Sequence, residues 1–145
     1  MADTLKFVSY NSGGFAQDKR TFIECLLADT DILFIQEHWL NHGNLGELDK
    51  VAINHVPHGE SGMPVGILRG PGRPYGGVAI YYSKEIAHDI VHQKSPDTKN
   101  IVHIKLGNNC HVINVYLPGD NYRQSYIDPE FQEAMDTLDE LGICS

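Results

Sequence analysis

Short hydrophobic runs along the first third of the chain predict alternating strands and helices. Leu5 to Tyr10 is rich in β-forming residues and is followed by the turn sequence Asn-Ser-Gly-Gly. From Gln17 to Ala28 the apolar residues recur at helical spacing, with charged residues between them. Ile32 to Ile35 is a continuous apolar run, typical of a strand covered on both faces. The pattern therefore predicts strand, helix, strand.

The remaining segments predict more strands and a second helix. Val51 to Val56 and Val78 to Tyr82 are strand candidates, and the loop between them is long and rich in Gly and Pro. Ile101 to Leu106 and Cys110 to Tyr116 surround the turn Gly-Asn-Asn, which predicts a hairpin. Tyr122 to Leu141 has helical spacing, with a glycine after it as a stop.

Length and composition are those of a single globular domain. The chain has 145 residues, of which 41% are hydrophobic and 21% charged, so we expect one α/β (α+β) domain over residues 1–145. No apolar run reaches the eighteen or so residues of a membrane span, and the start lacks a signal-peptide pattern. We therefore expect an intracellular protein without membrane attachment.

The net charge of −8 argues against binding to nucleic acid, whose affinity comes largely from Lys and Arg. The acidity is concentrated, however, because the segment from Asp120 to Glu140 has seven acidic residues and one arginine, a net of −6. The segment from Gly62 to Lys84 has no acidic residue, and Arg73 and Tyr75 within it are candidates to contact a polyanion. A solvated loop leading into a strand explains the same composition.

Two polar residues follow the first two predicted strands directly. Asn11 comes after the first strand and Glu37 after the second. If the intervening helix is a right-handed crossover, the strands are parallel and both residues lie at one edge of the sheet. A carboxylate beside a carboxamide offers the hard oxygen ligands that Mg²⁺ prefers. Turn capping by Asn11 and a solvated Glu37 are the alternative interpretation.

Tyr116 and the histidines are further candidates for chemistry. Tyr116 follows an apolar strand where the chain turns away, so its hydroxyl could hold a phosphate oxygen, although a structural strand tyrosine has the same pattern. The eight histidines include three pairs at spacing three or four, but none fits a zinc motif on a predicted helix. We expect exposed loop and strand histidines. No nucleophile elbow or P-loop occurs.

Four further motifs occur in order along the chain. They are the stretch 7–14, Phe-Val-Ser-Tyr-Asn-Ser-Gly-Gly; 31–40, Asp-Ile-Leu-Phe-Ile-Gln-Glu-His-Trp-Leu; 73–80, Arg-Pro-Tyr-Gly-Gly-Val-Ala-Ile; and 115–118, Val-Tyr-Leu-Pro. Taken together, they resemble the endonuclease/exonuclease/phosphatase superfamily, which is DNase I-like in fold. The form Gln-Glu-His-Trp-Leu is similar to the retrotransposon (LINE-type) branch.

The resemblance implies a two-sheet sandwich with flanking helices that cleaves phosphodiesters with Mg²⁺ or Mn²⁺. By this resemblance Asn11 is the active-site asparagine, Glu37 the metal-ligating glutamate and Tyr116 the tyrosine that contacts phosphate. It also implies DNA as the partner of a longer parent protein, with the nucleus as the compartment such a substrate suggests.

The sequence also departs from the family pattern. Gly13 stands where some relatives carry an acidic residue, and the family's Gly-Asp-Phe-Asn and Ser-Asp-His motifs are expected after the last helix, beyond Ser145. We therefore expect the C-terminal portion of the sandwich, with its His–Asp pair, to be absent, so that activity is weak or lost and an unpaired sheet edge favours self-association. A phosphatase of the superfamily and a non-catalytic binding module remain alternatives.

Overall fold

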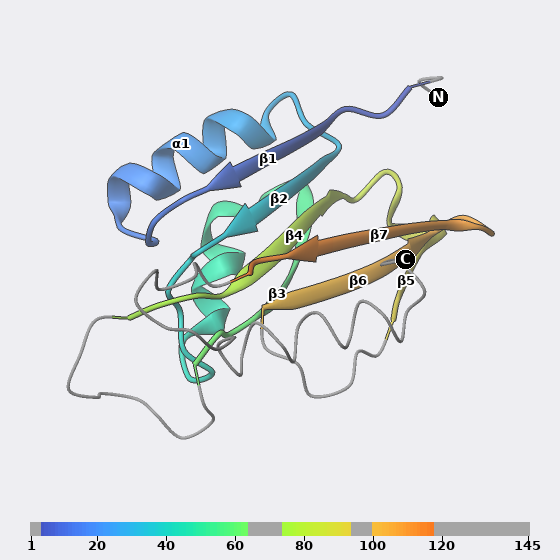
Figure 1. The fold of residues 1–145 in the computed structure, drawn as a ribbon. Coiled ribbons are helices and arrows are strands. Elements are labelled where there is room, and N and C mark those ends of the chain that lie inside the picture. The colour runs from blue at the N-terminus through green and yellow to red at the C-terminus, as the bar shows by residue number, and fades with distance from the viewer. Residues whose placement is uncertain (1–3, 64–73, 94–99, 118–145) are drawn as a thin grey trace.

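The computed structural model describes residues 4–63, 74–93 and 100–117 (Figure 1). These residues form two β-sheets, one α-helix and two short 3-10 helices. In chain order the elements are β1 Phe7–Asn11, α1 Gln17–Leu27, β2 Ile32–Gln36, the 3-10 helix η1 Leu45–Val51, β3 His55–Glu60, β4 Val78–Ser83, the 3-10 helix η2 Ala87–Asp89, β5 Ile90–His92, β6 Ile101–Leu106 and β7 Cys110–Val115.

The first sheet has the strand order β1-β2-β4-β3. β1 and β2 are parallel, with Asn11 opposite Gln36, and α1 connects them. β4 is antiparallel to both β2 and β3. The predicted strand–helix–strand unit is confirmed, and its two strands end at the same edge of the sheet.

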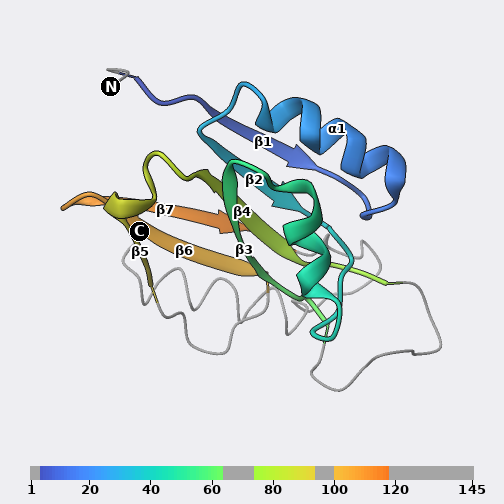
Figure 2. The same cartoon turned by 180° about the vertical axis from the view of Figure 1, so that it is seen from behind.

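The second sheet has the order β5-β6-β7, with antiparallel pairing throughout. Its last two strands form the predicted hairpin, in which Leu106 pairs with Cys110. This sheet lies against one face of the first sheet (Figures 1 and 2), and buried apolar side chains fill the interface. These are Ile32, Val78, Ile80 and Tyr82 from the first sheet and Val102, Ile104 and Val112 from the second.

The opposite face of the first sheet is covered by α1 and η1, as Figure 2 shows. Leu33 and Ile35 of β2 point to this face, whereas Ile32 points to the second sheet. Since successive strand residues face opposite sides, the apolar run of β2 is explained by burial on both faces. None of the helices within the described ranges is long and apolar enough to cross a membrane.

One strand prediction was wrong in its position, and one strand was missed. The segment from Val51 to Val56 was expected to be a strand, but Val51 ends η1, Ile53 is 82% exposed and β3 begins only at His55. β3 contains Pro57, which is tolerated because β3 lies at the edge of the sheet. The three-residue strand β5 has too short an apolar pattern to predict. The expected helix from Tyr122 to Leu141 lies outside the described residues.

Asn114 of β7 links the two sheets by hydrogen bonds. Its side-chain amide donates to the carbonyl oxygens of Ile35 (2.9 Å) and Ala79 (2.7 Å) in the first sheet. Its side-chain oxygen accepts a hydrogen bond of 2.9 Å from the amide of Gln36, which also donates to the Ser9 hydroxyl. Asn114 is only 3% exposed, so these bonds fix how the sheets stack.

We expect Asn114→Ala to lower the free energy of unfolding by about 3 kcal/mol, because it leaves buried polar groups without a partner. Urea denaturation followed by circular dichroism measures the change. Asn54→Ala, at an exposed position, is the control and should change stability by less than about 0.5 kcal/mol. Equal effects of the two substitutions would contradict a structural role for Asn114.

Candidate active site

The parallel pairing of β1 and β2 brings the residues after the two strands to one edge of the sheet. The backbone amide of Ser12 donates to the carbonyl of Gln36 (2.9 Å), and that of Gly14 donates to the carbonyl of Glu37 (2.8 Å). The turn after β1 is therefore bonded directly to the segment after β2. Asn11 lies at this edge, as predicted, but it is the last residue of β1 rather than the residue after it. Asn11 is exposed, and Glu37 follows Gln36, the register partner of Asn11.

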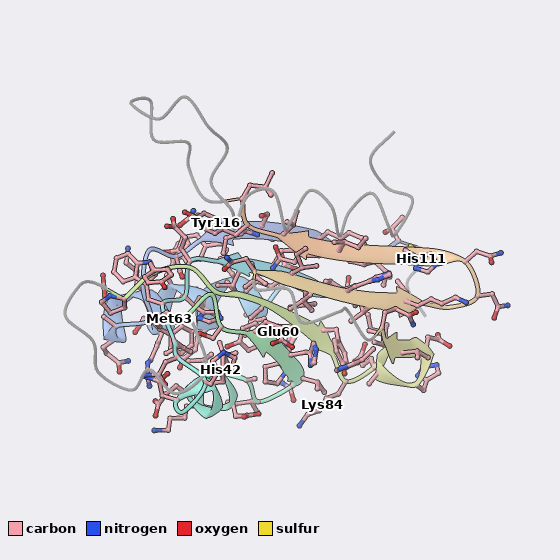
Figure 3. The ribbon with its side chains drawn as sticks, turned by 60° about the horizontal axis from the view of Figure 1, so that its bottom comes forward. His42, Glu60, Met63, Lys84, His111 and Tyr116 are labelled. Atoms are coloured by element: carbon pink, nitrogen blue, oxygen red, sulfur yellow. The ribbon has the colours of Figure 1, made fainter. Side chains whose placement is uncertain are left out.

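Tyr116 joins Glu37 from the second sheet. It follows β7, at the other end of that strand from His111 (Figure 3), and its hydroxyl donates a hydrogen bond of 3.0 Å to Oε1 of Glu37. Both side chains are half-buried. Burial, followed by the hydrogen bond to Glu37 and its charge, raises the pKa of Tyr116, so this hydroxyl keeps its proton and remains a donor at neutral pH.

The backbone around Glu37 is strained. Glu37 (φ 57°) and Trp39 (φ 64°) both adopt the left-handed conformation that side-chain-bearing residues rarely adopt. Two hydrogen bonds hold it: the Glu37 amide donates to the carbonyl of Gly77 (2.7 Å), and the Trp39 amide donates to that of Gly76 (2.9 Å). Strain of this kind persists where surrounding contacts enforce it, which is frequent at functional sites.

His38, between these two strained residues, points into the protein and is fully buried. Its Nδ1 accepts from the Leu40 amide (2.9 Å), and its Nε2 lies 3.0 Å from the carbonyl oxygen of Glu60, so the assigned tautomer carries its proton on Nε2. Desolvation lowers the pKa of His38 to about 4. His38 is thus a neutral packing residue rather than a base facing solvent.

The expectation that the histidines are exposed was wrong for three of them. His38, His55 and His103 are all at least 91% buried. His55 reaches the carbonyl oxygen of Thr30 (2.7 Å), and His103 pairs with His111 through their ring nitrogens (2.8 Å). A buried, hydrogen-bonded histidine behaves as a polar core residue, and a single sequence does not distinguish it from an exposed one. Within the described residues, no group of three or more His, Cys, Asp or Glu side chains could hold a metal ion.

Of the two residues expected to contact a polyanion, the structure describes only one. Tyr75 is described and is 43% exposed, so its ring is accessible, whereas Arg73 lies outside the described residues. Tyr81 and Tyr82, in the same acid-free segment, belong to the buried core. The Tyr81 hydroxyl donates to the carbonyl of Leu48 (2.8 Å), which excludes this ring from a binding surface.

Glu37 and Asn11 are a chemically suitable donor set for a hard divalent cation. Both supply oxygen, and Mg²⁺ is commonly held by one or two carboxylates together with water and substrate phosphate. Tyr116 engages only one oxygen of the Glu37 carboxylate, so the other is the candidate ligand. The donor chemistry fits a phosphate-processing metal site, and the assignment of these ligands stays a prediction.

Sequence reasoning assigned no role to the residues that hold the site in place, although Gly76 and Gly77 belong to one of the quoted motifs. The carbonyls of Gly76 and Gly77 bind the Glu37 segment, and the Gly77 amide donates to the side chain of Asn100 (2.7 Å). A glycine pair directly before a buried strand was the available signal, because such glycines mark positive φ or close backbone approach. Asn100 had no comparable signal.

Comparison with known proteins gives the family and the fold of the chain. The sequence profile of the Endonuclease/Exonuclease/phosphatase family matches residues 8–143. The chain belongs to this family, and its two-sheet α/β architecture is the DNase I-like fold. Among curated protein sequences, none matches the chain at a significant level.

Solved structures with the same fold include DNA-processing enzymes. An AP endonuclease from Archaeoglobus fulgidus has a TM-score of 0.61 and 20% identity, covering 95% of this chain and 49% of its own. The 3′ phosphatase NExo from Neisseria, bound to a product DNA hairpin, has a TM-score of 0.55 and 20% identity, covering 95% and 50%. The 3′–5′ exonuclease NExo from Neisseria meningitidis has a TM-score of 0.52 and 22% identity, covering 92% and 49%. The chain therefore spans about half the length of these structures.

Acidification is expected to destabilise the fold through His38. Because its folded pKa of about 4 lies below its ordinary value of 6.5, the unfolded chain binds more protons between these values, and stability falls as pH falls through that window. From pH 7 to pH 5 the His38 contribution amounts to about 2 kcal/mol. Denaturation curves of wild type and His38→Gln at several pH values isolate it, since all other titrating groups are shared. Parallel pH profiles would contradict the assignment.

Gly77→Ala should be strongly destabilising, because its β-carbon would overlap the His38 ring and its φ of +95° disfavours a side chain. We expect a loss of about 3 kcal/mol or more. Gly107→Ala is the matched control, since Gly107 has a φ of +66° with open space around it and should cost only about 1 kcal/mol. Thermal unfolding of the two variants separates overlap from backbone strain; a Gly77→Ala effect no larger than the control would exclude overlap.

Proposed function

We propose that this chain carries the carboxylate–tyrosine half of a divalent-metal-dependent phosphodiesterase site that acts on DNA, of the retrotransposon endonuclease type. The observation that carries the proposal is the hydrogen bond between Tyr116 and Glu37, which joins residues 79 positions apart. Two strands of different sheets end at this point, and a negatively charged oxygen and a protonated hydroxyl share one half-buried site.

The division of labour follows from the chemistry of the side chains. Glu37, with Asn11, would hold Mg²⁺ or Mn²⁺ through oxygen, and the metal when bound would neutralise charge on a phosphate and lower the pKa of water. Tyr116 keeps its proton, so its hydroxyl can donate a hydrogen bond to a phosphate oxygen instead of to the Glu37 carboxylate. The backbone hydrogen bonds around Glu37 fix the position of this segment before a ligand binds. The carboxylate therefore needs little rearrangement to bind a cation.

The retrotransposon type rests on the likeness of the motif Gln-Glu-His-Trp-Leu to that branch, and the structure shows how three residues of the motif are placed. In this motif Glu37 faces the site and His38 is buried. The ring of Trp39 packs directly against Gly14. A β-carbon on Gly14 would come within 3.0 Å of Trp39. His38 and Trp39 therefore have a physical role in shaping the Glu37 segment. Exposed Tyr75 is then suited to stack on a base or sugar of DNA.

The histidine next to Glu37 in the sequence is not available as a general base, and we propose weak or no activity for this chain by itself. The nearest candidate by sequence, His38, is buried, neutral and bonded on both nitrogens. A longer parent protein would carry the activity and act on DNA, with the nucleus as the corresponding compartment. β1 lies at the edge of its sheet and exposes Phe7, which is 47% accessible; we propose self-association through this edge.

Two other functions use the same structure differently. A phosphatase of the family would share the metal site but take a terminal phosphate, and a non-catalytic module would bind a partner without turnover. Hydrolysis of a 3′-phosphorylated oligonucleotide in place of plasmid nicking would favour the phosphatase. DNA binding that is indifferent to Glu37 and to metal would favour the binding module.

The first test is nicking of supercoiled plasmid with Mg²⁺ or Mn²⁺ and with EDTA, using this chain and any longer parent. In an active parent, Glu37→Ala should reduce metal-dependent nicking at least a hundredfold, because it removes the charged metal ligand. The matched control is Glu85→Ala, an exposed carboxylate just beyond β4 at the opposite end of the sheet, and it should leave nicking unchanged. Full activity of Glu37→Ala would refute the assignment.

A further inference from the structure

We infer that Asn100 is the positioning residue of the site, which holds the Glu37 segment and Tyr116 together from outside the ligand set. The importance of this role for metal binding rests on the proposed function. Asn100 lies directly before β6, on neither of the strands that end at the site, and none of the motifs that carry the family resemblance includes it.

Asn100 contacts both halves of the site with different atoms. Its side-chain oxygen accepts a hydrogen bond of 2.7 Å from the Gly77 amide. Its backbone carbonyl accepts one of 3.0 Å from the Tyr116 amide. The carbonyl oxygen of Gly77 in turn accepts a hydrogen bond of 2.7 Å from the Glu37 amide. A continuous path of three hydrogen bonds therefore runs from the backbone of Tyr116, through Asn100 and Gly77, to the backbone of Glu37.

The position requires asparagine for two separate reasons. Asn100 has φ +66°, a left-handed conformation that glycine and asparagine tolerate and most other residues do not. Asn100 is also only 3% exposed. Without its carboxamide oxygen, the buried Gly77 amide would have no hydrogen-bond acceptor. Glycine satisfies the first requirement only, whereas aspartate retains both the conformation and an accepting oxygen. The two reasons can thus be separated by substitution.

Close packing around the carboxamide leaves little freedom for it to move. A β-carbon added to Gly62 or to Gly76 would overlap Oδ1 of Asn100. Gly77 is enclosed on its other side by the His38 ring. The carboxamide is therefore enclosed by three glycines. A change in its position would shift Gly76 and Gly77, whose carbonyls accept the amides of Trp39 and Glu37. Removal of the carboxamide should loosen the Glu37 segment while the sheets remain intact.

The consequence for function is an effect on geometry rather than on ligand identity. Residues that orient metal ligands from the next layer commonly change metal affinity by 10- to 100-fold when they are replaced. We therefore expect Asn100→Gly to weaken Mn²⁺ binding about tenfold and to loosen the hydrogen bond between Tyr116 and Glu37, with wild-type secondary structure.

The test follows Tyr116 directly in the whole chain. ¹⁹F NMR at pH 7 of chain labelled with 3-fluorotyrosine gives one resonance for Tyr116, assigned by its loss in Tyr116→Phe. Glu37→Ala supplies the reference position for a Tyr116 that has lost its acceptor. Asn100→Gly should move the resonance toward this reference, and Asn100→Asp should restore it. Asn108→Gly, the same replacement in the exposed hairpin turn, should leave the resonance in place.

Titration with Mn²⁺, followed by electron paramagnetic resonance of the free ion, gives the affinity of each variant. A folded Asn100→Gly variant with an unmoved Tyr116 resonance and wild-type Mn²⁺ affinity would overturn the inference. If Mn²⁺ affinity is insensitive to Glu37→Ala, the proposed metal site fails; the Tyr116 resonance then still decides whether Asn100 positions the pair. Should Asn100→Gly fail to fold, Gly76→Ala carries the test, because its β-carbon would displace Oδ1 of Asn100 and should move the Tyr116 resonance. A folded Gly76→Ala variant with an unmoved resonance would equally contradict the role.

Discussion

The stacking of the two sheets creates the site, because Glu37 and Tyr116 belong to different sheets and meet only at one relative position of the two. Apolar side chains between the sheets supply most of the driving force for burial, but a non-directional force does not select a single alignment. Buried polar groups select the alignment, because their hydrogen bonds are directional. Asn114 has donors and an acceptor that are all satisfied in this alignment, so a shift of the sheets would leave several of them unpaired.

A second level of organisation acts on the loops at the end of the sheets. The strained conformations of Glu37 and Trp39 are maintained by the carbonyls of Gly76 and Gly77, and this glycine pair is held by Asn100 and by the ring of His38. These contacts come from segments that are far apart in the sequence. The site is thus built from one half-buried carboxylate and one half-buried tyrosine, supported by a larger set of buried groups that do not themselves face a substrate.

Local sequence patterns predicted the strand–helix–strand unit, β4 and the hairpin, since each has a clear period or a strong turn. They also predicted that Asn11 and Glu37 share an edge, because a crossover helix fixes parallel strands. The prediction for residues 51–56 was wrong because β-branched residues there suggested a strand, whereas Val51 is buried by η1 packing. β3, with a proline and a glycine, has a weak pattern that only its edge position permits.

Periodicity and local motifs were thus enough to predict the class of fold and the family. They also named Asn11, Glu37 and Tyr116 as candidates for the site, and that assignment stays a prediction. Local patterns gave no sign of the hydrogen bond between Tyr116 and Glu37, of the burial of His38, or of the contacts that Asn100 and Asn114 make; these follow from the tertiary structure. The physical reason is that hydrogen bonds and desolvation depend on groups brought close by sheet stacking, and the residues that supply them lie up to 79 positions apart.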